Sequence, residues 1–139
     1  MHTHLIYWPA VAMVALTLCV WLRMYFMRIA QMKRERIHPQ AVATSAQAAA
    51  RLTDSRAADN FRNLFELPVL FYLAVVVAAQ TGQVTLPALV LAWAFVALRI
   101  AHSLVHCTYN KVMHRFTLYL FGGIALWLLW AVLVAGLIA

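Results

Sequence analysis

Long apolar stretches alternate with short polar ones along the chain. Apolar residues dominate from about Leu5 to Met27, Leu67 to Ala79, Leu86 to Leu98 and Phe116 to Ala139. A helix needs about 20 mostly apolar residues to cross a hydrocarbon core of ~30 Å. The pattern therefore predicts an all-α integral membrane protein, a bundle of four transmembrane helices in one domain, residues 1–139.

The polar breaks between these stretches set the expected helix boundaries. His38-Pro39 disfavours helix, and the stretch that follows is rich in Ala, Ser, Thr and Gln without large apolar side chains. We therefore expect a loop over about 37–54. The predicted helices cover about 5–36, 55–80, 86–110 and 113–138.

The second and third helices reach spanning length only if polar residues enter the membrane with them. The apolar run from Leu67 to Ala79 is too short to span alone. The run from Leu86 continues into Arg99, His102, Ser103 and His106, which recur at helical spacing. A short turn around Gly82 joins the two helices and predicts an antiparallel hairpin.

Counting residues from this turn predicts which polar side chains meet. Glu66 lies sixteen residues before Gly82 and Arg99 seventeen after it, which is ~24 Å and ~25 Å along a helix at ~1.5 Å per residue. We therefore expect Glu66 and Arg99 to form a structural ion pair or a water-bridged contact, or to contact a ligand together. The same count places Asn63 opposite His102 and Asp59 opposite His106.

The distribution of charge predicts how the four helices are oriented in the membrane. The chain is 65% hydrophobic and 11% charged, with a net charge of +7. Its Lys and Arg residues fall in two stretches, Arg23 to Arg62 and Arg99 to Arg115. Short cytoplasmic loops collect Lys and Arg, so both stretches are predicted to be cytoplasmic and both termini non-cytoplasmic. A polybasic membrane-surface patch is a second interpretation; no aromatic-basic platform or groove-reading motif indicates nucleic acid.

The histidine pair of the third helix does not predict a metal site. His102 and His106 have the i, i+4 spacing of two ligands on a helix, but the Glu of a zincin motif is missing. The further candidates His114 and Cys107 lie at no spacing that requires them to join. We predict no metal.

Two motifs together resemble a known family. Asn63-Leu64-Phe65-Glu66-Leu67-Pro68 is similar to the Asn-x-x-Glu followed by Pro of the MAPEG family, the membrane-associated proteins in eicosanoid and glutathione metabolism. The stretch Arg99-Ile-Ala-His-Ser-Leu-Val-His106 with the later Arg115 resembles the family's Arg-Ile-Tyr-His-Thr-Ile-Ala-Tyr and its later Arg. The chain most resembles a bacterial-type microsomal glutathione transferase.

The resemblance implies a homotrimer that binds glutathione as a co-substrate between neighbouring subunits, near the cytoplasmic face. It implies a transferase or peroxidase that acts on lipophilic small-molecule electrophiles arriving with membrane lipid, in a bacterial inner membrane. Glutathione carries two carboxylates, an ammonium and a thiol, so its site needs Arg donors, a carboxylate and a group that favours the thiolate. The thiolate is the nucleophile, and a nearby cation lowers the thiol pKa.

By the same resemblance, Arg115 is the catalytic residue that stabilises the thiolate. Plain positive-inside anchoring is the alternative for Arg115 and Arg34. The chain has Asp59 and Phe61 where the transferases of the family carry an Arg and often a polar contact, so Arg56 or Arg62 is expected to supply the missing cation. The expected glutathione contacts are Arg34, Asn63, Glu66, His106, Tyr109, Arg56 and Arg62.

Family membership does not fix catalysis, because one fold can carry different functions. The departures at Asp59 and Phe61 favour an alternative, a non-catalytic lipid-binding or scaffold protein with the same four helices.

Overall fold

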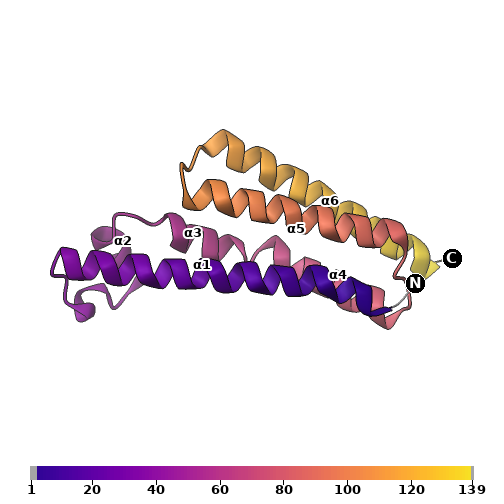
Figure 1. Cartoon of the computed structure of the whole chain (residues 1–139), viewed down its shortest axis with the longest axis horizontal. Helices are drawn as coiled ribbons and strands as arrows, with labels where there is room; N and C mark the ends of the chain where they lie inside the picture. The colour runs from indigo at the N-terminus through magenta and orange to yellow at the C-terminus, as the bar shows by residue number, and fades with distance from the viewer. Residues whose placement is uncertain (1–2, 139) are drawn as a thin grey trace.

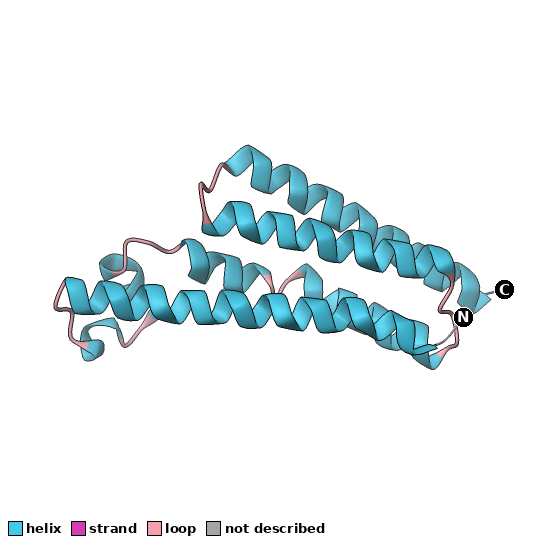
Figure 2. Cartoon of the chain, in the orientation of Figure 1, coloured by secondary structure: helices cyan, strands magenta, loops and turns pink. Residues whose placement is uncertain are grey.

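The structure is a bundle of helices (Figures 1 and 2). It is a computed structural model and describes residues 3–138. In chain order the elements are η1 (Thr3–Ile6), α1 (Tyr7–Arg34), η2 (Pro39–Val42), α2 (Ser45–Arg51), α3 (Arg56–Asn63), α4 (Leu67–Gln80), α5 (Leu86–Cys107) and α6 (Val112–Ile138).

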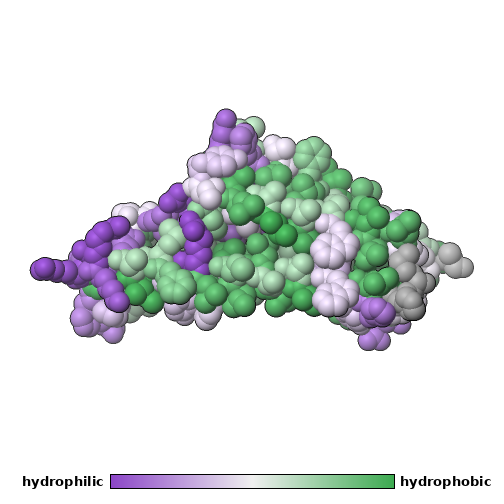
Figure 3. All heavy atoms as spheres, in the orientation of Figure 1, coloured by the Kyte–Doolittle hydropathy of each residue, from purple (hydrophilic) through white to green (hydrophobic). Residues whose placement is uncertain are grey.

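Four stretches of the described chain are long and apolar enough to cross a membrane. They are Thr3–Arg34, Arg56–Gln80, Leu86–Cys107 and Val112–Ile138, which confirms the predicted four-helix membrane bundle. Hydrophobic residues cover most of the middle of the face in Figure 3, and hydrophilic residues gather at the end that carries α2. Large exposed apolar side chains such as those of Phe26 and Leu104 suit a lipid surround.

The helices run alternately up and down, so their connections gather at two ends. The start of α1 and the end of α6 lie at one end of the bundle (Figure 1). The α1–α3 connection, residues 35–55, and the α5–α6 turn, residues 108–111, lie toward the other, which we call the basic end. Both basic stretches of the sequence therefore lie toward the same end.

Close contacts between helices hold the interior together. The most extensive packing joins α5 to α6, where Gly122 of α6 faces Leu98 of α5: an added Cβ would lie 3.8 Å from Leu98 Cβ, an ordinary van der Waals contact. Phe71 of α4 stacks on Phe95 of α5 with ring centroids 4.7 Å apart. Both phenylalanines are fully buried.

The second span is broken, whereas the sequence analysis predicted one helix over 55–80. The chain leaves the helix at 64–66, between α3 and α4. Pro68 explains the break, because proline has no N–H to donate to the carbonyl of Leu64 and its ring clashes with that carbonyl. Glu66 at the break has φ −95° and ψ −107°, outside the helical region.

The other boundaries differ from the prediction by a few residues. The loop over 37–54 contains the short elements η2 and α2, and Thr44 and Gln47 form a capping box at the start of α2. The third helix ends at Cys107 rather than at residue 110. Asn110 has a φ of +53°, in the left-handed region, and helps to turn the chain into α6.

Candidate functional site

A layer of buried polar side chains lies toward the basic end of the bundle. The residue counts from Gly82 predicted such a layer on the second and third spans. Polar side chains of this kind are costly within a membrane span unless they find partners, so they mark the candidate site. The buried polar residues on α3 and α5 are Asn60, Arg99, His102, Ser103 and His106.

Arg99 binds the backbone at the helix break. Its side chain is fully buried, and its Nη2 donates to the carbonyl oxygen of Asn63 at 2.6 Å. In an unbroken helix that carbonyl would accept from the N–H of Leu67. The Arg99 guanidinium carbon also lies 5.5 Å from the centroid of the Tyr119 ring, a cation–π contact. Nε and Nη1 of Arg99 have no hydrogen-bond partner within residues 3–138.

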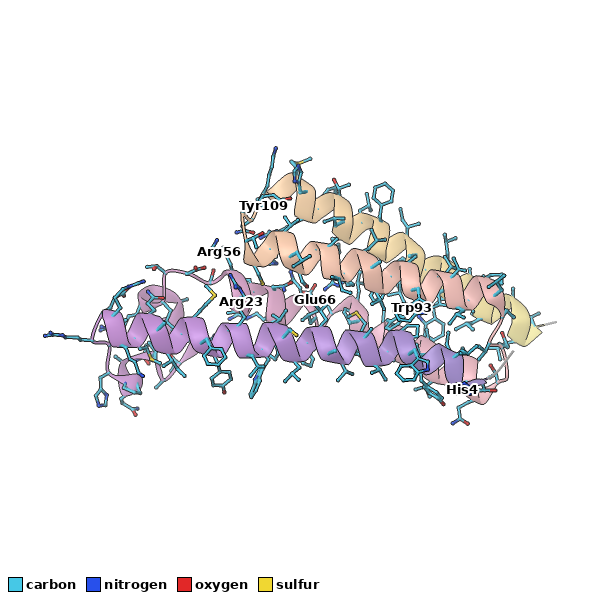
Figure 4. All side chains as sticks on the ribbon, viewed as in Figure 1. His4, Arg23, Arg56, Glu66, Trp93 and Tyr109 are labelled. Carbon is cyan, nitrogen blue, oxygen red and sulfur yellow. The ribbon has the colours of Figure 1, made fainter. Side chains whose placement is uncertain are left out.

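Glu66 and Arg99 form no direct ion pair, the first of the arrangements expected for them; a water-bridged contact and a shared ligand stay predictions. No oxygen of Glu66 lies within 4.0 Å of a nitrogen of Arg99, although both residues are described. The Tyr119 hydroxyl donates to Glu66 Oε2 at 3.4 Å while the ring of Tyr119 faces Arg99. Glu66 lies at the helix break and is exposed (Figure 4). Tyr119 of α6 therefore contacts both charged residues, Glu66 through its hydroxyl and Arg99 through its ring.

His102 connects α5 to the backbone of Arg115. Its Nδ1 lies 3.1 Å from the Arg115 carbonyl oxygen, and because a carbonyl only accepts, Nδ1 is the donor. The ring of His106 packs edge-on at 5.6 Å between centroids. His102 Nε2 and His106 Nδ1 are buried without a partner in the described chain. The same part of the chain holds no cluster of three or more His, Cys, Asp or Glu residues suited to a metal.

Arg115 itself is half-buried at the start of α6. Its Nη1 donates to Asn110 Oδ1 at 2.6 Å, and none of the other described residues accepts from the rest of its guanidinium. Tyr109 is 62% exposed, and its hydroxyl forms a 2.9 Å hydrogen bond with Nδ1 of His114. The α5–α6 turn and the first turn of α6 thus present a phenol and a cation at the basic end.

Asn60 is a buried residue of this layer that the sequence analysis missed. It is fully buried, accepts from the Ser103 hydroxyl at 3.3 Å and donates Nδ2 to Cys107 Sγ at 3.5 Å. The count from Gly82 that paired Asn63 with His102 places Asn60 opposite Val105, two residues from its observed partner Ser103. The count therefore gives the depth of Asn60 but not its partner.

Arg56 forms structural contacts at the end of α5. It pairs with Asp54 at 2.7 Å and donates Nη1 to the Thr108 carbonyl, while Arg23 of α1 donates to the Cys107 carbonyl at 2.8 Å (Figure 4). Two arginines thus satisfy carbonyls at the C-terminus of α5. The bidentate contact with Arg56 lowers the pKa of Asp54 below its ordinary value, and partial burial opposes this only in part.

The other two predicted arginines are exposed. Arg62 lies 3.8 Å from Asp59, and the 74% exposed side chain of Arg34 pairs with the adjacent Glu35 at 3.3 Å. The end of α1 extends past the α5–α6 turn (Figure 1), and none of the described contacts joins Arg34 to Arg115. Of the predicted site residues, Asn63 and Glu66 lie at the helix break, His106 lies on α5, Tyr109 lies in the α5–α6 turn and Arg115 lies in the first turn of α6.

Comparison with known proteins decides the family. The model of the MAPEG family matches residues 6–135. The chain belongs to the MAPEG family. No curated protein and no solved structure matches it. The MAPEG family comprises membrane four-helix bundles and includes both glutathione transferases and non-catalytic members.

An apolar groove runs along one side of this MAPEG protein. It encloses about 500 Å³ between α1 and the broken second span, and its lining is almost entirely apolar. Phe61, at a position where a polar contact was expected, lines the groove instead. The groove reaches the helix break through Leu64 and Phe65. Its lining residues are Val14, Thr17, Leu18, Trp21, Phe61, Leu64, Phe65 and Tyr72.

Proposed function

We propose that this MAPEG protein is a membrane-bound glutathione-dependent transferase or peroxidase that acts on lipophilic electrophiles. One observation carries the proposal: the Arg115 guanidinium is fixed by Asn110, and none of the other described residues uses its remaining N–H groups. A half-buried arginine with unused donors is suited to an anion such as a thiolate. Membership of a family that includes glutathione transferases supports the choice of thiol.

The chemistry requires a thiolate close to a cation. Arg115 stabilises the thiolate of glutathione, and the thiol proton passes to water. In conjugation, the sulfur electron pair forms a C–S bond as the leaving group departs with its own pair. In peroxide reduction, the thiolate cleaves the O–O bond to give a sulfenate and an alcohol. The sulfenate takes up a proton from water to give the sulfenic acid, which a second glutathione thiol converts to the disulfide with release of water.

Glu66 is suited to the ammonium group of glutathione, with Asn63 beside it. An exposed carboxylate within a membrane span is costly unless it is solvated or covered. In the proposal, a bound peptide and a neighbouring subunit of a homotrimer cover it. Exposed cations such as Arg34 and Arg62 then contact the peptide carboxylates across the subunit boundary. The proposed site faces the cytoplasm, at the basic end, in a bacterial inner membrane.

The test is glutathione binding and turnover in detergent. Calorimetric titration should show saturable binding, and conjugation to a lipophilic aryl halide should follow. Arg115→Ala should lower kcat/KM about 100-fold, as expected for the loss of a donor to a developing or resident anion. Lys111→Ala removes an exposed cation four residues away and is the matched control. Absence of saturable binding to the wild type would refute the proposal.

A non-catalytic lipid-binding protein is the second candidate. The apolar groove of about 500 Å³ favours it, because Phe61 adds apolar surface where the transferases often place a polar group. Native mass spectrometry should then find lipid bound to the wild type and less lipid bound to Phe61→Ser. Turnover of any electrophile with glutathione would exclude this candidate as the whole function.

A further inference from the structure

The α5–α6 turn places an amide side chain against the cation of the proposed site. Asn110 Oδ1 accepts from Arg115 Nη1 at 2.6 Å, a short distance for an N–H···O hydrogen bond. This is the one side-chain hydrogen bond of the Arg115 guanidinium among residues 3–138. The orientation of the guanidinium therefore depends on Asn110.

The backbone conformation of the α5–α6 turn holds Asn110 in place. Its φ is +53°, and asparagine is one of the few non-glycine residues that adopt this region readily. Its N–H donates to the carbonyl of Val105 at 2.8 Å, which closes the end of α5. The amide thus projects from a defined backbone position toward Arg115.

A second contact holds the backbone of the same arginine. His102 Nδ1 donates to the Arg115 carbonyl at 3.1 Å, and His102 is buried. His102 of α5 therefore holds the main chain of Arg115, and Asn110 of the turn holds its side chain. Two independent contacts on one residue are more than a positive-inside anchor requires.

The chemical nature of Asn110 is informative. A carboxylate at this position would form an ion pair with Arg115 and reduce the positive potential that an anion meets. An amide oxygen accepts the same hydrogen bond without a net charge. We propose that Asn110 is a positioning residue that orients the Arg115 guanidinium while leaving its charge available to an anionic ligand. That the anion is a glutathione thiolate rests on the proposed function.

Two substitutions separate these effects. Asn110→Gly removes the acceptor but keeps the left-handed backbone, which glycine adopts without strain. Asn110→Asp keeps an acceptor and adds a charge. Arg36→Gly is the matched control, because Arg36 also has a positive φ, +52°, and lies beyond the end of α1.

The first measurement needs no ligand. In the detergent-solubilised full chain with ¹⁵N-labelled arginine, the Arg115 side-chain resonances are assigned through Arg115→Lys. Rotation about the guanidinium Nε–Cζ bond should be slow in the wild type and in Arg36→Gly, and at least tenfold faster in Asn110→Gly. Equal rotation rates in Asn110→Gly and the wild type would overturn the proposal.

The second measurement follows thiolate absorbance of bound glutathione against pH. The midpoint should rise by about one pH unit in Asn110→Asp, which is a tenfold change in the thiolate equilibrium. It should rise by less in Asn110→Gly and stay unchanged in Arg36→Gly. A purely structural role would lower thermal stability and leave the midpoint in place. If the wild type binds no glutathione, the proposed function fails, and the rotation rates still decide the role of Asn110.

Discussion

The Arg99 guanidinium donates a 2.6 Å hydrogen bond to the backbone carbonyl of Asn63, the last residue of α3. The carbonyl is free because the second span breaks before Pro68, and a buried arginine of the third span reaches it. Within a membrane, a broken helix is tolerated where another group satisfies the freed backbone. The arginine and the proline therefore depend on each other.

Arg99→Met should lower the free energy of unfolding by about 1–2 kcal/mol, because the Asn63 carbonyl loses its donor. The loss should be smaller in a Pro68→Ala background, where the helix can continue and the Leu67 N–H can bond that carbonyl. Unfolding in detergent of the wild type, both single variants and the double variant gives the coupling. Equal losses in the two backgrounds would contradict the dependence.

Tyr119 contributes mainly through its ring. Tyr119→Phe removes only the 3.4 Å hydrogen bond to the exposed Glu66, so stability should change by less than about 0.5 kcal/mol. Tyr119→Leu also removes the cation–π contact with Arg99 and should cost about 1 kcal/mol more. Thermal unfolding of the two variants checks the order, and a larger loss for Tyr119→Phe would show that the hydroxyl dominates.

The buried pair Asn60 and Ser103 should show strong non-additivity. Asn60→Leu and Ser103→Ala each leave a buried polar group without its partner, which costs about 1–3 kcal/mol. The double variant leaves neither and should cost clearly less than the sum. Chemical unfolding of the three variants measures the coupling; additive losses would mean that the 3.3 Å hydrogen bond contributes nothing.

Asp54 should make stability depend on acid pH. Its pKa is lower in the folded chain than its ordinary value of 3.8, because Arg56 binds the carboxylate. The contribution is therefore complete above that value and is lost as pH falls through the lower folded pKa. Asp54→Asn should be less stable than the wild type near neutral pH, with the difference shrinking below about pH 4. A pH-independent difference in melting temperature would argue against this pairing.

The sequence predicted the spans and the depth of the polar layer, because hydropathy and residue counts along a helix are local properties. The direct contacts of Glu66 and Arg99 could not be predicted in the same way. The residue count assumed an unbroken second helix with side-chain partners, whereas Arg99 binds a main-chain carbonyl and Glu66 contacts Tyr119 of α6. Counting residues along the second and third spans cannot predict that a side chain of the fourth span contacts both of these residues.

The break itself had a visible cause. Pro68 interrupts the helix because proline lacks the N–H donor and its ring clashes with the preceding turn, so the sequence itself contains the signal for the break. The depth of Asn60 could have been predicted by the same count that placed Asn63. The left-handed turn at Asn110 is harder to predict from the sequence, because the end of a helix within a polar stretch can be placed only to within a few residues.

The irregular backbone at 64–66 also affects how this chain can vary. In a continuous helix, one inserted or deleted residue rotates every later side chain by about 100° relative to the bundle. At this interruption the irregular backbone can accommodate such a change. The side chains of α4 then keep their lipid-facing and core-facing sides, while those of α3 rotate relative to the bundle. The half of the second span nearest the polar layer can thus diversify without altering the half that crosses the membrane core.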